Sequence, residues 1–163
     1  MPKISSKTKN GYTLIEVLIS LVIISILFGI SFLNFRDFSR KQNLVSLSRE
    51  IKGDLALARE NAVSGKKPSN ISCNQPNTLS GYNFRVVTET NYVIEAVCSE
   101  GTVEVKDVEI PSGFSISPML TNPIFFKVLS EGTNLSEEAT ITLNQENTEY
   151  TFNIYVAQSG EIK

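Results

Sequence analysis

The chain has 163 residues with 15 basic and 17 acidic side chains, two cysteines and no histidine, a size that allows one long helix and one modest domain. Without histidine it lacks the commonest general base and metal ligand, and two cysteines are too few for a structural zinc site, so we expect no metal and no cofactor. The net charge of −2 becomes −5 without the three lysines of residues 1–11, and a mildly acidic exterior does not indicate a polyanionic partner.

The first 11 residues form a short polar leader that contains Lys3, Lys7 and Lys9 and no acid. A long apolar run follows, and its 19 residues from 17 to 35 carry no charge. This is about the length that a helix needs to cross a hydrocarbon core of roughly 30 Å. The lysines ahead of the run predict that the N-terminus stays in the cytoplasm and that the rest of the chain is exported.

Glu16 is the one acid near the start of this apolar run. An ionisable side chain at the end of a membrane span is by default a candidate functional residue. If the chain were cut between Gly11 and Tyr12, Glu16 would be the fifth residue of the shortened chain. The new amine at Tyr12 of a neighbouring subunit would then neutralise the Glu16 carboxylate.

The segment Gly11-Tyr12-Thr13-Leu14-Ile15-Glu16 resembles the processing and assembly motif of type IV prepilins and type II secretion pseudopilins. In that family a prepilin peptidase cleaves after the glycine and methylates the new N-terminus. The resemblance therefore implies cleavage after Gly11, N-methylation at Tyr12, and an assembly role for Thr13, Leu14, Ile15 and Glu16. Two departures are Tyr12, where phenylalanine is usual, and Leu33, near the place where many members have a proline.

Two other interpretations of the N-terminus are possible from the hydropathy. A secretory signal peptide has a shorter apolar core and an alanine-containing cleavage site, but residues 30–45 contain no alanine. A plain membrane anchor fits the hydropathy equally well, yet it explains neither Glu16 nor Gly11. The prepilin interpretation explains both residues.

Residues 36–63 are predicted to continue the helix with an amphipathic character. Apolar residues recur there at helical spacing, which indicates a stripe packed on a domain: Leu44, Leu47, Ile51, Leu55, Ala58 and Ala62. Ser64-Gly65, followed by Pro68, is typical of a helix stop. We therefore expect one helix from Tyr12 to Val63, on the order of 78 Å long.

From Asn70 onward, apolar and polar residues alternate and indicate strands. The predicted strands are 70–73, 82–86, 92–98, 103–110 with a bulge at Lys106-Asp107, 114–116, 124–129, 139–143 and 150–156. A long helix followed only by strands must bury its stripe against one sheet face, which gives an α+β fold.

This predicts a long N-terminal helix, membrane-spanning in its first half, packed on an antiparallel β-sheet domain as in type IV pilins. The expected segments are a leader (1–11), a transmembrane and filament-core half of the helix (12–35), its amphipathic half (36–67) and an extracytoplasmic β domain (68–163).

A second resemblance is to the GspH/FimT-type minor pseudopilins, which commonly carry an LxxARxxA pattern in this helix. The matching residues are Leu55, Ala58, Arg59 and Ala62. The segments 124–133 and 154–162, together with Ile141, are similar to the closing strands of that family. The middle third of the chain has no such likeness.

Export would place Cys73 and Cys98 in an oxidising compartment, where a pair of cysteines indicates a disulfide. Such a bridge would be worth on the order of 3 kcal/mol. The alternative is two separate buried thiols.

The function expected from the first resemblance is that of a minor pilin or pseudopilin, a structural subunit of a type IV pilus or a type II secretion pseudopilus. Its partners would be other subunits, the prepilin peptidase, and the cytoplasmic (inner) membrane with its assembly platform. The chain would first be a single-pass protein of that membrane and then part of the filament.

The alternative is a FimT-like minor pilin that captures DNA in a natural-transformation machine. Nucleic-acid binding needs clustered bases, but residues 111–163 contain Lys127 and Lys163 against six acids, so DNA is not expected as a direct contact. No grouping of nucleophile and base and no Gly-rich phosphate loop is present, so we do not expect an enzyme.

Overall fold

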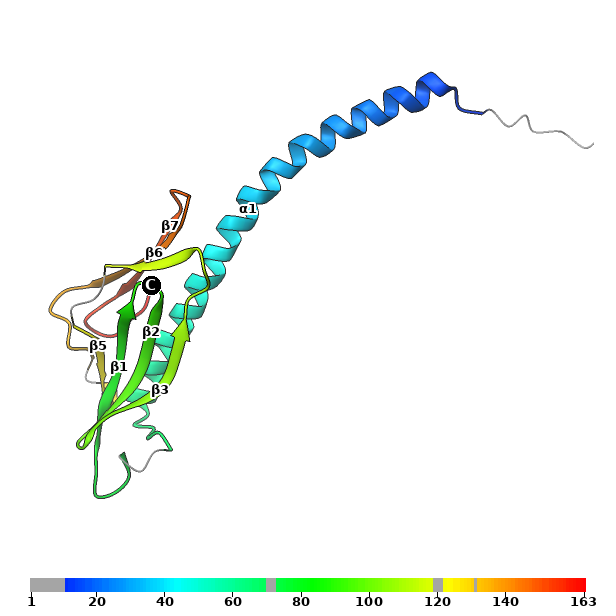
Figure 1. The fold of residues 1–163 in the computed structure, drawn as a ribbon. Helices are drawn as coiled ribbons and strands as arrows, with labels where there is room; N and C mark the ends of the chain where they lie inside the picture. Colours follow the sequence, from blue (N-terminus) through cyan, green and yellow to red (C-terminus); the bar gives the residue numbers. More distant parts are fainter. Residues whose placement is uncertain (1–10, 70–72, 119–121, 131) are drawn as a thin grey trace, which may run out of the picture. The chain divides into compact units, whose positions relative to one another are not determined.

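The computed structural model describes residues 11–69, 73–118, 122–130 and 132–163, and for residues 30–37 it describes the backbone only. The chain divides into two compact units, Met1–Arg40 and Lys41–Lys163. One helix, seven strands and one short 3-10 helix make up the described secondary structure (Figure 1).

The helix α1 (Leu14–Val63) has 50 residues and begins two residues after the predicted start at Tyr12. The carbonyl of Thr13 accepts hydrogen bonds from the backbone N–H groups of Glu16 and Val17, at 3.1 and 3.3 Å, and so starts the first turn. Among the residues that the structure describes, no helix contains a stretch both long enough and apolar enough to cross a membrane. The predicted span at 12–35 is not confirmed, and the side chains of 30–35 lie outside the described set.

The second half of α1, from Lys41 onward, packs on the strands of its own unit. All six residues of the predicted stripe are buried, which confirms the amphipathic pattern: Leu44, Leu47, Ile51, Leu55, Ala58 and Ala62. The helix ends at Val63, as predicted. The N–H of Lys66 donates to the carbonyl of Asn61, and the N–H of Gly65 donates to the carbonyl of Ala62. These two bonds form a Schellman motif, which needs the positive φ of 60° at Gly65.

The first sheet is antiparallel, with the strand order β3-β2-β1-β5. Its strands are β1 (Leu79–Thr88), β2 (Asn91–Cys98), β3 (Gly101–Glu109) and β5 (Ile124–Lys127). Figure 1 shows β1, β2 and β3 side by side. The strand β5 returns from later in the chain to pair with β1, where Phe126 lies opposite Tyr82.

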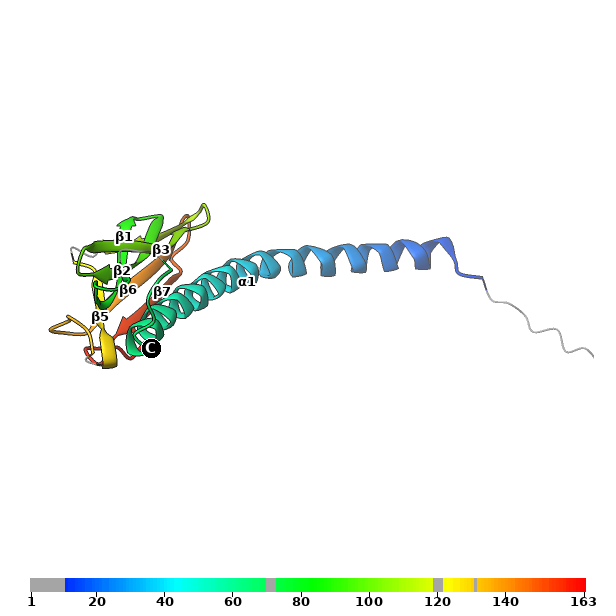
Figure 2. The same cartoon turned by 90° about the horizontal axis from the view of Figure 1, so that it is seen from below.

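The second sheet has the strand order β4-β6-β7 and is also antiparallel. Its strands are β4 (Phe114–Ser117), β6 (Ala139–Gln145) and β7 (Thr151–Val156). Figure 2 shows this sheet and the first one beside the second half of α1. The expectation of one sheet is therefore wrong, because β4 pairs with β6 and not with β3, the strand before it.

The strands also depart from the prediction in their details. The strand expected at 124–129 ends at Lys127, because Leu129 adopts a left-handed φ of 55° within η2 (Val128–Ser130). The bulge in β3 falls at Val105 instead of Lys106-Asp107. Of the strand expected at 70–73, residues 70–72 lie outside the described residues and Cys73 is not in a strand.

The core of this unit is built from α1 and both sheets. The largest fully buried side chains include two tyrosines and two phenylalanines from the first sheet, and aliphatic residues from the helix and from both sheets: Tyr82, Tyr92, Phe84, Phe126, Ile51, Leu55, Ile94, Ile116, Ile124, Ile141, Leu143 and Ile154. The helix stripe thus meets two sheets that share one apolar interior.

Candidate functional site

The predicted processing residues lie in the exposed segment just before α1. Gly11, Tyr12 and Thr13 are all exposed, and the side chain of Tyr12 is 83% accessible. Apart from Gly11 and its two neighbours in the chain, no atom of the described residues lies within 4 Å of the position that a Cβ would take at Gly11. The bond between Gly11 and Tyr12 therefore lies in an exposed stretch outside regular secondary structure, where proteases generally act.

Glu16 is in the first turn of α1 and is exposed. A negative charge there interacts favourably with the positive end of the helix dipole. Thr13 and Glu16 also have the spacing of a capping box, Thr-x-x-Glu. Glu16 therefore supports the start of the helix within its own chain, and its carboxylate remains accessible to a group outside it.

The apolar residues from Leu14 to Phe28 form one continuous exposed surface, which we name the apolar face. It consists of Leu14, Ile15, Val17, Leu18, Ile19, Leu21, Val22, Ile23, Ile24, Ile26, Leu27 and Phe28, each 47% or more accessible. The hydroxyls of Ser20 and Ser25 donate to the carbonyls of Glu16 and Leu21, both at 2.8 Å, so their hydrogen-bond donors are satisfied by the helix backbone. Exposed apolar surfaces of this extent mark sites of contact with protein or membrane.

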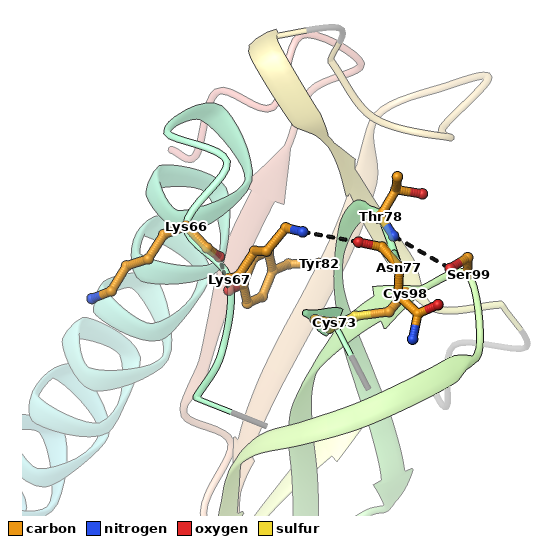
Figure 3. Close-up of a disulfide and its surroundings, with 8 residues drawn as sticks. All are labelled: Lys66, Lys67, Cys73, Asn77, Thr78, Tyr82, Cys98 and Ser99. Atoms are coloured by element: carbon orange, nitrogen blue, oxygen red, sulfur yellow. Dashed lines mark hydrogen bonds between the residues drawn. A yellow bond between two sulfur atoms is a disulfide. The ribbon is translucent and has the colours of Figure 1, made fainter. Parts of the chain in front are cut away.

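The predicted cysteine pair lies in the other unit, where Cys73 and Cys98 form a disulfide with their Cα atoms 5.4 Å apart (Figure 3). Both cysteines are buried, and Cys98 is the last residue of β2. The bridge joins the segment after α1 to the first sheet.

Two hydrogen bonds near the bridge hold the segment after α1. The Lys67 ammonium donates to the Asn77 carbonyl at 2.9 Å within the segment (Figure 3), and the Tyr82 hydroxyl of β1 donates to the carbonyl of Lys66. Burial raises the pKa of Tyr82 above its usual value. The segment after α1 is thus held to the first sheet by the disulfide and by the hydrogen bond from Tyr82.

A buried acid joins the helix to the first sheet. Asp54 is 6% exposed, and its carboxylate accepts hydrogen bonds from the Tyr92 hydroxyl at 2.6 Å and from the Lys106 ammonium at 2.7 and 2.8 Å. Burial, and then the hydrogen bond to Asp54, raise the pKa of Tyr92 far above its usual value. Because all three groups are paired, the cluster fixes the position of α1 on β2 and β3.

Sequence reasoning missed this cluster. A signal was present, because Asp54 follows Ile51 by three residues and precedes Ala58 by four, which places it on the buried helical stripe. An acid at such a position needs a buried partner. The sequence could not show that the partners are Tyr92 and Lys106, since those residues lie 38 and 52 positions away.

The structure therefore keeps the predicted site residues in two places. Gly11, Tyr12, Thr13, Leu14, Ile15 and Glu16 are contiguous at the start of α1, while Cys73 and Cys98 are in the other compact unit.

Comparison with known proteins bears on the first of these places. Residues 6–32 match the sequence profile of the prokaryotic N-terminal methylation motif, a stretch that includes Gly11 to Glu16 and the whole apolar face. The match supports a type IV pilin-like protein of the pilin or pseudopilin type, with processing by a prepilin peptidase and assembly with other pilins. Neither the curated proteins nor the solved structures gave a match to this chain.

Proposed function

We propose that this chain is a minor pilin or pseudopilin that a prepilin peptidase cleaves after Gly11 and methylates at the amine of Tyr12. The observation that carries the proposal is the methylation motif at 6–32, which overlaps a continuous exposed apolar surface on one helix. An exposed apolar surface of this extent is expected to be covered by protein or membrane. The cytoplasmic membrane would cover it before assembly, and other subunits would cover it within the filament.

In the assembled filament, Glu16 would form an ion pair with the methylated amine of Tyr12 on a neighbouring subunit. Apolar side chains would surround this pair, and a charge removed from water is tolerated only when a partner of opposite charge accompanies it. The pair would set the axial register between subunits. The resemblance at Leu55, Ala58, Arg59 and Ala62 favours a GspH/FimT-like subunit, which would serve a type IV pilus or a type II secretion pseudopilus.

This role is structural and not enzymatic. The alternative of direct DNA capture has little support in the charges of the domain. Lys66-Lys67 and Arg40-Lys41 are the two adjacent basic pairs of the chain after the leader, and the ammonium of Lys67 already donates to the Asn77 carbonyl. We expect no gel shift of DNA by this chain at low salt.

The variant Glu16→Gln tests the pairing role. We expect the variant to reach the membrane and lose residues 1–11, while its incorporation into filaments falls by about tenfold or more. The reason is that removing one partner of a buried ion pair costs about 3–5 kcal/mol. The measurement is the amount of the chain in sheared filaments relative to the amount in the membrane fraction.

Glu60→Gln is the matched control, because Glu60 is an exposed acid on the same helix. It should assemble like the parent chain. The loss of helix-dipole stabilisation in Glu16→Gln, about 0.3–1 kcal/mol, is too small to produce a tenfold effect by itself. Normal incorporation of Glu16→Gln would refute the pairing role.

A further inference from the structure

A small cavity opens in the β-strand-containing unit, between the last turns of α1, the strand β5 and two glycine-containing turns. Its volume is about 110 Å³, and it is lined by Arg59, Val63, Phe126, Lys127, Gly132, Ser159 and Gly160. A single water needs roughly 10–15 Å³, so this cavity accommodates a group of several heavy atoms. We propose that it binds a carboxylate that is carried on a short aliphatic stem.

Charge is the first argument. Among the residues that the structure describes, Arg59 and Lys127 are the charged side chains that line the cavity, and none of these lining residues is an acid. In the described parts of the chain, neither cation takes part in an ion pair; the pairs there are Arg85–Glu95, Lys106–Asp54 and Lys163–Glu161. Residues 41–163 as a whole contain five more acids than bases. The cavity is therefore a locally positive site in an acidic unit.

Geometry is the second argument. The Arg59 side chain passes over Gly160, where an added Cβ would lie 3.4 Å from Arg59 Nε and 3.5 Å from Phe126 Cδ1. Gly160 also has a φ of 81°, a conformation that side chains disfavour. The N–H of Thr133 donates to the carbonyl of Gln158 at 2.9 Å and so ties the two turns together. The contacts of Arg59 with Gly160 and the nearby ring of Phe126 thus place the arginine side chain beside the cavity.

The lining favours a carboxylate over a phosphate. Val63 and Phe126 present carbon atoms that suit a methylene stem, while a guanidinium matches a carboxylate with two parallel hydrogen bonds. Phosphate sites commonly use a helix N-terminus or a nest of backbone N–H groups. Here α1 contributes its C-terminal end, whose partial negative charge makes a doubly charged ion less favourable.

Titration of the full-length, detergent-solubilised chain tests the proposal by NMR at constant ionic strength. The probe is the α-methylamide of N-acetylglutamate, which presents one side-chain carboxylate. We expect saturable shifts of the amide signals of Gly132, Ser159 and Gly160 and of the Arg59 Nε–H signal. Arg59→Gln should weaken the binding at least about tenfold, as expected for loss of a charge-assisted bidentate contact.

Arg49→Gln is the matched control, because Arg49 is an exposed arginine on the same helix and lies outside the cavity. It should bind the probe like the parent chain. N-acetylglycine, which presents a chain-terminal carboxylate, is the second probe. Tighter binding of N-acetylglycine would indicate that the natural ligand is a chain terminus, and tighter binding of the glutamate probe would indicate an acidic side chain.

Several results would overturn the proposal. They are equal shifts with the neutral α-methylamide of N-acetylglutamine, tighter binding of inorganic phosphate, or an equal loss of binding in Arg49→Gln. No binding by the parent chain together with a lower melting temperature of Arg59→Gln would mean that Arg59 only packs on Gly160. If the Glu131→Gln variant binds the probe and the parent chain does not, an acid of this chain itself occupies the cavity. Glu131 is the acid to test, because it adjoins Gly132 in the sequence and lies outside the described residues.

Discussion

One buried acid of the helix, Asp54, connects α1 to the first sheet through polar side chains. Asp54 lies in the interior with Tyr92 and Lys106, and each partner comes from a different strand of that sheet. Removing a single partner of such a cluster leaves a buried group unsatisfied, which costs about 1–3 kcal/mol. The three residues therefore contribute to the orientation of α1 as well as to stability.

The raised pKa of Tyr92 predicts a loss of stability at high pH. A tyrosine whose pKa is raised by folding stabilises the native state fully below its unfolded pKa of about 10, and this contribution is lost as the pH rises above that value. Each such tyrosine should lower the free energy of unfolding by about 1.4 kcal/mol per pH unit between pH 10 and its folded pKa. Urea unfolding measured at several pH values between 8 and 11 gives the change in the free energy of unfolding per pH unit.

Tyr92→Phe should unfold more easily at pH 8, by about 1–3 kcal/mol, and should have a shallower slope above pH 10. Burial also raises the pKa of Tyr82, so Tyr82 would still contribute to the decrease of the free energy of unfolding with pH in this variant. Tyr155→Phe is the control, because Tyr155 is partly accessible at 36%. An unchanged slope in Tyr92→Phe would contradict this interpretation.

At the scale of elements, the helix could be predicted more fully than the sheets. The spacing of Leu44, Ile51 and Ala58 indicates which side of α1 is buried, and Ser64-Gly65 indicates where it ends. Both depend on residues a few positions apart. The pairing partner of each strand depends instead on residues far away in the sequence. The alternation of apolar and polar residues at Phe114 and at Phe126 therefore predicts two strands, but it does not show that they belong to different sheets.

The same reason explains which site residues could be predicted. Gly11 to Glu16 are contiguous, so their pattern is readable in the sequence. The cavity proposed to bind a carboxylate has Arg59 and Gly160 in its wall, and all seven described strands lie between these two residues in the sequence. Only the folded chain brings those two residues together.

The disulfide connects two elements, and its removal should destabilise the β-strand-containing unit. Cys73 and Cys98 are separated by 25 positions, and closing a loop of this length is worth about 3 kcal/mol. We expect the double variant Cys73→Ala/Cys98→Ala to lose about this much in urea unfolding. Reductant should produce a similar loss in the parent chain and none in the double variant. A parent chain that does not respond to reductant would contradict this role of the bridge.

At the scale of the whole molecule, the two compact units differ in how their apolar residues are satisfied. The unit from Lys41 onward buries its apolar residues in its own core. The apolar face of the first unit remains exposed along Leu14 to Phe28. The proposed function therefore requires a cover from outside the chain, and the cleavage that prepares the chain for it.

The intact mass of the chain, extracted from the membranes of cells with an active prepilin peptidase, tests this claim most directly. We predict a mass that lacks residues 1–11 and carries one additional methyl group on the amine of Tyr12. A chain that still begins at Met1 would contradict the account, because Glu16 would then have no processed N-terminal amine to pair with on a neighbouring subunit.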